Sequence, residues 1–322
     1  MSALRLRVAL RRGALITAAN WPLVAVGFIA DSLYKAALGV PVVGGAVMVA
    51  ALAGDDVATL LSQGLRAGVA QVFASLMDAP VALGAFATAI AVVGFGGAVI
   101  VFLVQAGSVA VIVAGELRAP IELNAGSIRM DALRLAQAAS LEGFLGGVAR
   151  FGRRLTLLGA GLVVAYAVTF AAFGVSLIAE YRVASSVEWI SAFPLLALLT
   201  TGALAVVVAA INLLYLLTQI IIVAEDCTLR VAMGHLRRFL MHDARQVAGI
   251  FGVILTIVVV GTAASILATA GLGLIAWVPF VGLAVMPLQA AFWLARGLVF
   301  QFIDFTALTA YLAQYRRFAE QE

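Results

Sequence analysis

The chain has 322 residues, of which 64% are apolar and only 11% are charged. Soluble domains carry roughly a quarter charged residues, and no soluble domain of this length can bury so much apolar surface, so its main solvent must be hydrocarbon. Twenty basic residues against sixteen acids give a net charge of +4, and in a membrane protein such an excess belongs to the flanks of spans. The single cysteine, Cys227, excludes an intramolecular disulfide and gives no sign of an oxidising compartment.

The first apolar run, residues 14–38, follows a basic start and predicts a retained first span. Asn20, Trp21 and Pro22 interrupt the run, and no small-residue cleavage site follows, so the pattern does not favour a removed signal peptide. Its 25 residues correspond to about 38 Å of helix, which crosses a bilayer with some tilt. Asp31 and Lys35 are four residues apart and are predicted to pair on one helix face.

Two segments separate this span from the next apolar run. Residues 41–54 are apolar but only fourteen long, which favours a re-entrant or interfacial piece over a span. Residues 56–78 carry apolar side chains at helical spacing and predict an amphipathic helix that lies on the membrane or over the span ends.

The second apolar run, residues 80–115, contains no charge and exceeds one bilayer thickness, and Gly94, Gly96 and Gly97 are predicted to break or kink it. Four more runs follow, the last two joined by a tight turn at Trp277–Pro279: 155–179, 193–224, 247–276 and 280–305. Basic amphipathic segments precede two of them, at 128–154 and 229–245. The sequence therefore predicts an all-α polytopic transmembrane bundle, a single domain over 1–322, with six spans arranged as three hairpins.

The distribution of basic residues predicts the orientation of the chain. Sixteen of the twenty lie at the start, in the stretches 116–154 and 225–246, and in the tail, which places them on one side of the membrane. By the positive-inside rule this side is the cytoplasm, so we expect a bacterial inner-membrane protein with both termini cytoplasmic. The basic segments have too few aromatic residues for nucleic acid and suit anionic lipid head groups. The candidate head-group contacts are Arg11, Arg12, Arg153, Arg154, Arg237 and Arg238.

The exits of two even-numbered spans are alike: SVAVIVAGEL at 108–117 and TQIIIVAEDC at 218–227. This similarity is what a duplicated hairpin predicts. Chance similarity between two short apolar segments is the alternative, and the sequence leaves both open.

The pattern IVAEDCTLRVAMGHLRRFLMHDARQVAGIFGVIL resembles a loose motif of bacterial six-span proteins. In these proteins an apolar helix ends in Val-x-Glu, an alanine follows about seven residues later, and a basic segment enters the next span. They include the membrane domain attached to some glycerophosphodiester phosphodiesterases. The resemblance covers mainly residues 212–256, with an echo at 108–160, and the serine that often follows the alanine is not matched. It implies a six-span architecture and carries over no active site.

Polar residues inside apolar spans are functional candidates by default. They define either a polar path between spans for a substrate head group or inter-helix hydrogen bonds, worth only about 0.6–2 kcal/mol each. Asn212 and Gln219 are predicted to share a helix face, as are Asn20 and Asp31, while Arg296 either reaches the cytoplasmic boundary or pairs with Asp304. The candidates are Asn20, Gln105, Asn212, Gln219, Gln289 and Arg296.

Motifs for catalysis or metal binding are weak. His235 and His242 are seven residues apart, whereas two ligands of one metal on one helix usually lie three or four apart, so a basic interfacial helix is favoured. The glycine pairs Gly64–Gly68 and Gly143–Gly147 indicate close helix packing.

These observations favour a non-enzymatic membrane protein without a cofactor or a metal, acting as a scaffold or a subunit of a membrane complex in contact with anionic lipid. Its expected partners are membrane lipids, other proteins or further copies of itself. The alternative is a transporter or permease for a lipid or a small amphiphile, and a membrane enzyme ranks third.

Overall fold

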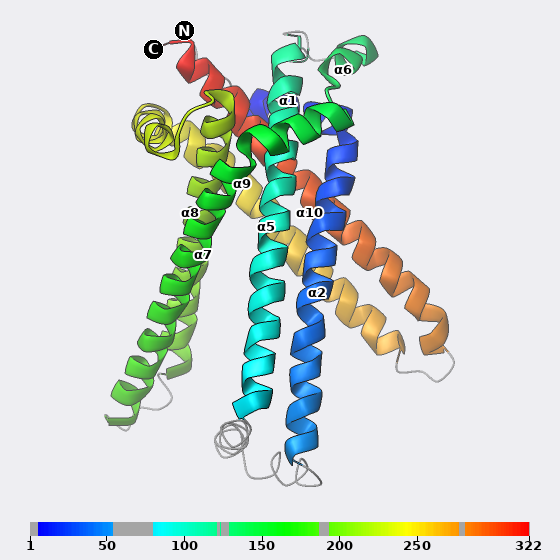
Figure 1. The fold of residues 1–322 in the computed structure, drawn as a ribbon, viewed down its shortest axis with the longest axis vertical. Helices are drawn as coiled ribbons and strands as arrows, with labels where there is room; N and C mark the ends of the chain where they lie inside the picture. The colour runs from blue at the N-terminus through cyan, green and yellow to red at the C-terminus, as the bar shows by residue number, and fades with distance from the viewer. Residues whose placement is uncertain are drawn as a thin grey trace. The chain divides into compact units, whose positions relative to one another are not determined.

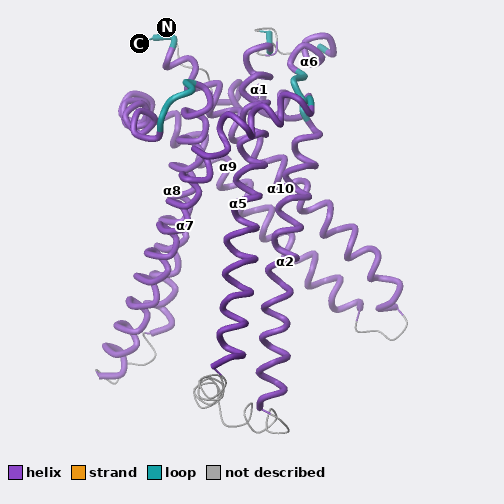
Figure 2. The backbone as a smooth tube through the Cα atoms, in the orientation of Figure 1, coloured by secondary structure: helices purple, strands orange, loops and turns teal. Residues whose placement is uncertain are grey.

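The computed structural model describes residues 6–53, 80–120, 123, 129–186, 193–276 and 281–321, and every regular element in these ranges is a helix. Figure 1 colours the helices in chain order, and Figure 2 colours the described helices and loops by secondary structure. The helices are α1 (Leu6–Ala19), α2 (Trp21–Ala53), α5 (Pro80–Arg118), α6 (Met130–Ala136), α7 (Leu141–Ser186), α8 (Phe193–Ala224), α9 (Leu229–Ala276) and α10 (Val281–Ala319).

Six of these helices are long and apolar enough to cross a membrane, which confirms the predicted all-α polytopic architecture. The apolar stretches are Trp21–Gly45, Gly84–Arg118, Leu141–Ser186, Phe193–Ala224, Leu229–Ile275 and Val285–Ala319. Helices satisfy their own backbone hydrogen bonds, which is why apolar chains adopt them in lipid.

The chain divides into two compact units, where the sequence predicts a single domain. One unit comprises Met1–Phe28 and Gln105–Glu322, and the other comprises Ile29–Val104. In the smaller unit the hydroxyl of Tyr34 in α2 donates to the carbonyl of Gly94 in α5 at 3.3 Å. The predicted pair of Asp31 and Lys35 is confirmed there, with Lys35 Nζ 2.6 Å from Asp31 Oδ2.

The first predicted span, 14–38, has wrong boundaries. The chain turns at Asn20, so α1 ends at Ala19 and α2 begins at Trp21, with Pro22 in the first turn, where its missing N–H is harmless. The prediction of a separate re-entrant piece at 41–54 is also wrong, because α2 continues through Pro41 to Ala53. Proline is tolerated inside such apolar helices. The predicted helix 56–78, the pair Gly64–Gly68 and the turn Trp277–Pro279 lie outside the described residues.

Helix α5 runs without interruption from Pro80 to Arg118, so the predicted break at Gly94, Gly96 and Gly97 is wrong. The glycine at position 97 is explained by packing, because a Cβ there would collide with the ring of Tyr34. This glycine permits the close approach of an aromatic ring and leaves the helix intact.

The basic segments also differ in detail from their predictions. In the described part of the segment 128–154, residues 129–154, the chain forms two helices, the short α6 and the beginning of α7, with residues 137–140 between them. Non-helical backbone angles at Asp243 (φ −115°, ψ 23°) mark a kink between two helices inside α9, so the basic segment meets the following span there, two residues before its predicted end at Arg245. Helix α10 continues to Ala319, so the last span and the cytoplasmic tail of the prediction form one helix.

The core of the larger unit lies where α1, the last third of α10, the end of α8 and the beginning of α9 meet (Figure 1). Helix α1 packs along α10, and a Cβ on Gly13 would lie 2.6 Å from the Thr306 carbonyl oxygen. Helices α7 and α8 pack as one hairpin and α9 and α10 as another. In α8 the buried residues cluster at 217–223, whereas Leu199 and Val206, farther from the core, are exposed.

Candidate functional site

A buried ion pair joins α1 to the end of α5. Arg12 Nε lies 2.8 Å from Glu116 Oε1, and both side chains are less than 10% exposed. The other two nitrogens of Arg12 donate to the carbonyls of Pro120 and Ala119, each at 3.1 Å. A guanidinium at a helix C-terminus compensates for carbonyls that lack helical partners. Arg12 therefore cannot contact a lipid head group, which corrects the prediction for this residue.

Asn20 fixes the turn between α1 and α2. Its side-chain oxygen accepts hydrogen bonds from the amides of Ala138 and Ala139 at 2.7 and 2.9 Å. Its nitrogen donates to the carbonyls of Ile16 and Ala136 at 2.9 and 3.0 Å. The side chain is fully buried, so the structure places Asn20 in a structural joint and not along the same helix face as Asp31.

The acidic exit of α8 forms a helix cap. Asp226 has a left-handed backbone with φ 46°, and the Cys227 amide donates to the Ile222 carbonyl at 3.3 Å, as in a Schellman motif. The Asp226 carboxylate accepts hydrogen bonds from Arg150 at 2.6 Å and Arg154 at 2.7 Å, both in α7. These hydrogen bonds lower the pKa of Asp226, whereas burial raises the pKa of Cys227. We refer to Arg150, Arg154 and Asp226 as the aspartate clasp.

Three of the candidate polar residues in spans form hydrogen bonds between helices. Tyr215 and Gln219 of α8 both donate to Gln105 Oε1 of α5, at 2.8 and 2.9 Å. Asn212 accepts from Tyr166 of α7. Asn212 and Gln219 therefore bond to different neighbouring helices.

The other two candidates lie in α10 and are half-buried. The guanidinium of Arg296 stacks on the ring of Phe300, with 5.6 Å between its central carbon and the ring centre. This cation–π contact lies one helical turn along α10. Gln289 lies seven residues before Arg296, so the two share a face of α10.

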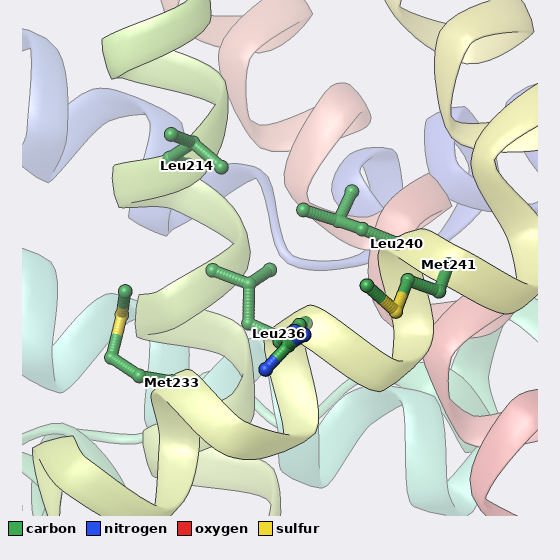
Figure 3. A pocket seen from close by; sticks show the side chains of 6 residues that line it. Leu214, Met233, Leu236, Leu240 and Met241 are labelled. Atoms are coloured by element: carbon green, nitrogen blue, oxygen red, sulfur yellow. The ribbon is translucent and has the colours of Figure 1, made fainter.

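A cavity of about 330 Å³ opens between α8 and the first turns of α9 (Figure 3). Five apolar side chains and one arginine line it: Leu214, Met233, Leu236, Arg237, Leu240 and Met241. Figure 3 shows Leu214 of α8 on one side and Leu236 of α9 facing it, with Met233 and Met241 farther out. We call it the α8–α9 cavity. A second cavity, of about 450 Å³, shares Met241 with the first and is lined by Arg238, Met241, His242, Phe318 and Gln321.

The candidate head-group arginines thus have different surroundings. Arg153, Arg237 and Arg238 are exposed, Arg11 is half-buried, and Arg154 is held in the aspartate clasp. Of the exposed arginines, Arg237 and Arg238 border cavities.

The two histidines lie in separate surroundings. His235 Nδ1 lies 3.2 Å from the hydroxyl of Tyr315, which donates to Glu225 Oε1 at 3.3 Å. His242 lies 3.3 Å from Asp243. Among the described residues, no group of three or more histidine, cysteine and acidic side chains could hold a metal ion.

The sequence does not single out Glu116, Tyr166, Tyr215 or Tyr315, which complete these networks. Tyr215 is four residues before Gln219, so its position on the same helix face is a signal that the sequence contains. Glu116 stands at the end of a span, where an acid has no local partner, and Arg12 is 104 positions away.

No protein-family model, curated protein or solved structure matches the chain. The site is therefore interpreted from its own residues.

Proposed function

We propose that this chain is a non-enzymatic protein of the bacterial inner membrane that acts as a scaffold or a subunit of a membrane complex in contact with anionic lipid. One observation carries the proposal. The larger unit has its core at one end, while the remaining lengths of its hairpins present apolar side chains outward. None of the residues in the most apolar stretch of α7 is buried. Such faces suit lateral contact with lipid or with other membrane helices.

The hydrogen bonds of the in-span polar residues support the same proposal. Gln105, Gln219 and Asn212 all bond to neighbouring helices, which is the arrangement expected of packing contacts. The test is native mass spectrometry of the protein extracted gently from its own membrane. We expect companion proteins at fixed stoichiometry. A bare chain that turns over a lipid or a phosphoester would overturn the proposal.

The alternative function is a transporter or permease for a lipid or a small amphiphile, and the α8–α9 cavity is the observation in its favour. Replacing Asn212 or Gln289 by leucine separates the two functions. A packing role predicts a changed stability, whereas a transport path predicts lost flux with the stability retained.

We further propose that both termini are cytoplasmic. Most of the described arginines lie in α1, at the end of α5, in α6, in the first turns of α7 and α9, and at the end of α10, and basic residues are concentrated on the cytoplasmic side of membrane proteins. The test is thiol labelling in a Cys227→Ser background. We expect Gln321→Cys to react only after the membrane is permeabilised. Ser186→Cys, at the C-terminal end of α7 and far from its basic N-terminal turns, should react in intact spheroplasts. The reverse pattern would contradict this orientation.

A further inference from the structure

The α8–α9 cavity is lined by five apolar side chains and by one positively charged side chain, Arg237. Met233, Arg237 and Met241 follow one another at intervals of four residues, and Leu236 and Leu240 lie beside them on the same helical face. Leu214 closes the opposite side from α8. The buried packing face of this part of α9 is formed by Ala232, Leu236 and Phe239, and Arg237 lies exposed beside it.

Arg237 forms no ion pair with any residue in the part of the chain that the structure describes. Arg237 is exposed, so its guanidinium is accessible to an anion from outside the chain. Arg12 and Arg154, by contrast, each have a carboxylate partner within 3 Å. A ligand that carries both an anion and apolar groups matches the exposed guanidinium of Arg237 and the apolar lining beside it.

The position of the cavity indicates the source of that anion. The segment Leu229–Arg245 contains four arginines and one acid, Asp243, and the kink at Asp243 marks where it leads into the apolar part of α9. Such a basic amphipathic segment next to a span lies at the membrane surface and attracts anionic lipid. Phospholipids supply both a phosphate and apolar chains, and they are concentrated at this depth.

We propose that the α8–α9 cavity binds one anionic phospholipid. Its phosphate accepts hydrogen bonds from Arg237, and part of an acyl chain lies among Leu214, Met233, Leu236, Leu240 and Met241. The volume of about 330 Å³ belongs to an open hollow on the protein surface, so a lipid bound there stays in contact with the surrounding bilayer. Methionine side chains adapt their shape readily, which suits a flexible chain. This inference rests on the part of the proposed function that places the chain in contact with anionic lipid.

The test uses the purified full-length protein, stripped of lipid in detergent and titrated under native mass spectrometry. The probes are phosphatidylglycerol and phosphatidylcholine with identical acyl chains. We expect one phosphatidylglycerol to bind more tightly than phosphatidylcholine. Arg237→Gln should weaken phosphatidylglycerol binding by roughly 10- to 100-fold, the range for a lost hydrogen bond to a charged group. Arg182→Gln removes the same charge from an exposed position that borders neither cavity and is not a candidate head-group contact, and it should leave binding unchanged.

A second variant examines the apolar wall. Leu214→Trp places an indole in the cavity and leaves Arg237 intact, and we expect it to weaken the binding of phosphatidylglycerol by a similar factor. Glycerol phosphate, which has the anion without the chains, should not compete. Leu214 and Arg237 are both exposed in part, so these variants should retain the melting temperature of the unchanged protein.

Three results would overturn the inference: equal affinity for the two lipids, equal weakening by Arg237→Gln and Arg182→Gln, or full competition by glycerol phosphate. Failure here is distinguishable from failure of the proposed function. A protein that retains stoichiometric companions from its own membrane but shows no lipid preference contradicts the lipid site alone.

Discussion

Arg12 Nε lies 2.8 Å from Glu116 Oε1, across 104 positions of the chain, with both side chains nearly excluded from solvent. The second carboxylate oxygen of Glu116 is buried without a hydrogen-bond partner among the described residues. This contact fastens the N-terminal helix α1 to the end of α5. The pair is therefore a structural joint whose loss should be costly when only one partner is removed.

The first prediction is that Glu116→Leu lowers the free energy of unfolding by about 3–5 kcal/mol, because it leaves the Arg12 guanidinium buried without its counter-charge. The measurement is unfolding in detergent micelles followed by circular dichroism. Its control is the double variant Arg12→Met with Glu116→Leu, which buries no unpaired charge and should recover a large part of the loss. If adding Arg12→Met lowers the free energy of unfolding of Glu116→Leu as much as an independent buried substitution would, the two side chains are not coupled.

The second prediction concerns Asn20. Asn20→Ala removes four side-chain hydrogen bonds and leaves buried backbone groups of Ile16, Ala136, Ala138 and Ala139 without these partners. We expect a loss of stability on the order of 2–4 kcal/mol, since each unsatisfied buried polar group costs about 1–3 kcal/mol and some reach water after relaxation.

Trp21→Ala is the control for Asn20→Ala, because Trp21 is the next residue and is 65% exposed. It should change stability by no more than about 1 kcal/mol. A polar path through Asn20 makes a different prediction, namely that Asn20→Ala is tolerated as well as Trp21→Ala.

Hydropathy and length were sufficient to predict six spans and their pairing into hairpins, because a chain this apolar can satisfy its backbone in lipid only as helices. The error in the first span boundary arises where contacts between residues far apart in the sequence decide where a helix ends. Asn20 ends α1 because its four partners come from α1 itself and from residues 136–139. Nothing in the local sequence shows that those residues are nearby.

The α8–α9 cavity was less predictable from the sequence than the fold. The basic character of residues 229–245 was evident from the sequence, but a cavity also needs Leu214 from another helix. Arg12 and Arg237 have the same side chain in similar basic segments, yet one is buried against Glu116 and the other borders the cavity. Only the packing of distant segments distinguishes them.

The third prediction concerns the pH dependence of the aspartate clasp. Hydrogen bonds from Arg150 and Arg154 lower the pKa of Asp226 in the folded state. The clasp therefore contributes its full stability above the unfolded-state pKa of about 3.9 and loses it as the pH falls through the lower, folded-state value. Asp226→Asn retains the left-handed backbone, which asparagine tolerates, but loses the charge.

The measurement for the clasp is the melting temperature of the unchanged protein and of Asp226→Asn at a series of pH values from 7 to 3. We expect a constant difference above about pH 5, which closes as the carboxylate is protonated. Asp226→Ala should lower the melting temperature further at every pH, because alanine also strains the left-handed position. A gap between the unchanged protein and Asp226→Asn that widens on acidification is inconsistent with this account.

The fourth prediction uses two adjacent glycines of α7 as a matched pair. A Cβ on Gly147 would lie 2.6 Å from the Cβ of Ala110 and 3.2 Å from the Cα of Gly107, both in α5, whereas a Cβ on Gly146 would meet nothing within 4 Å. Gly147→Leu should therefore force the two helices apart and cost about 1–3 kcal/mol or more, as overpacking does, while Gly146→Leu should be neutral or slightly stabilising because leucine favours a helix over glycine. Thermal unfolding of both variants in the same detergent measures the contrast. Equal melting temperatures for the two would mean that α7 does not pack closely on α5 at this glycine.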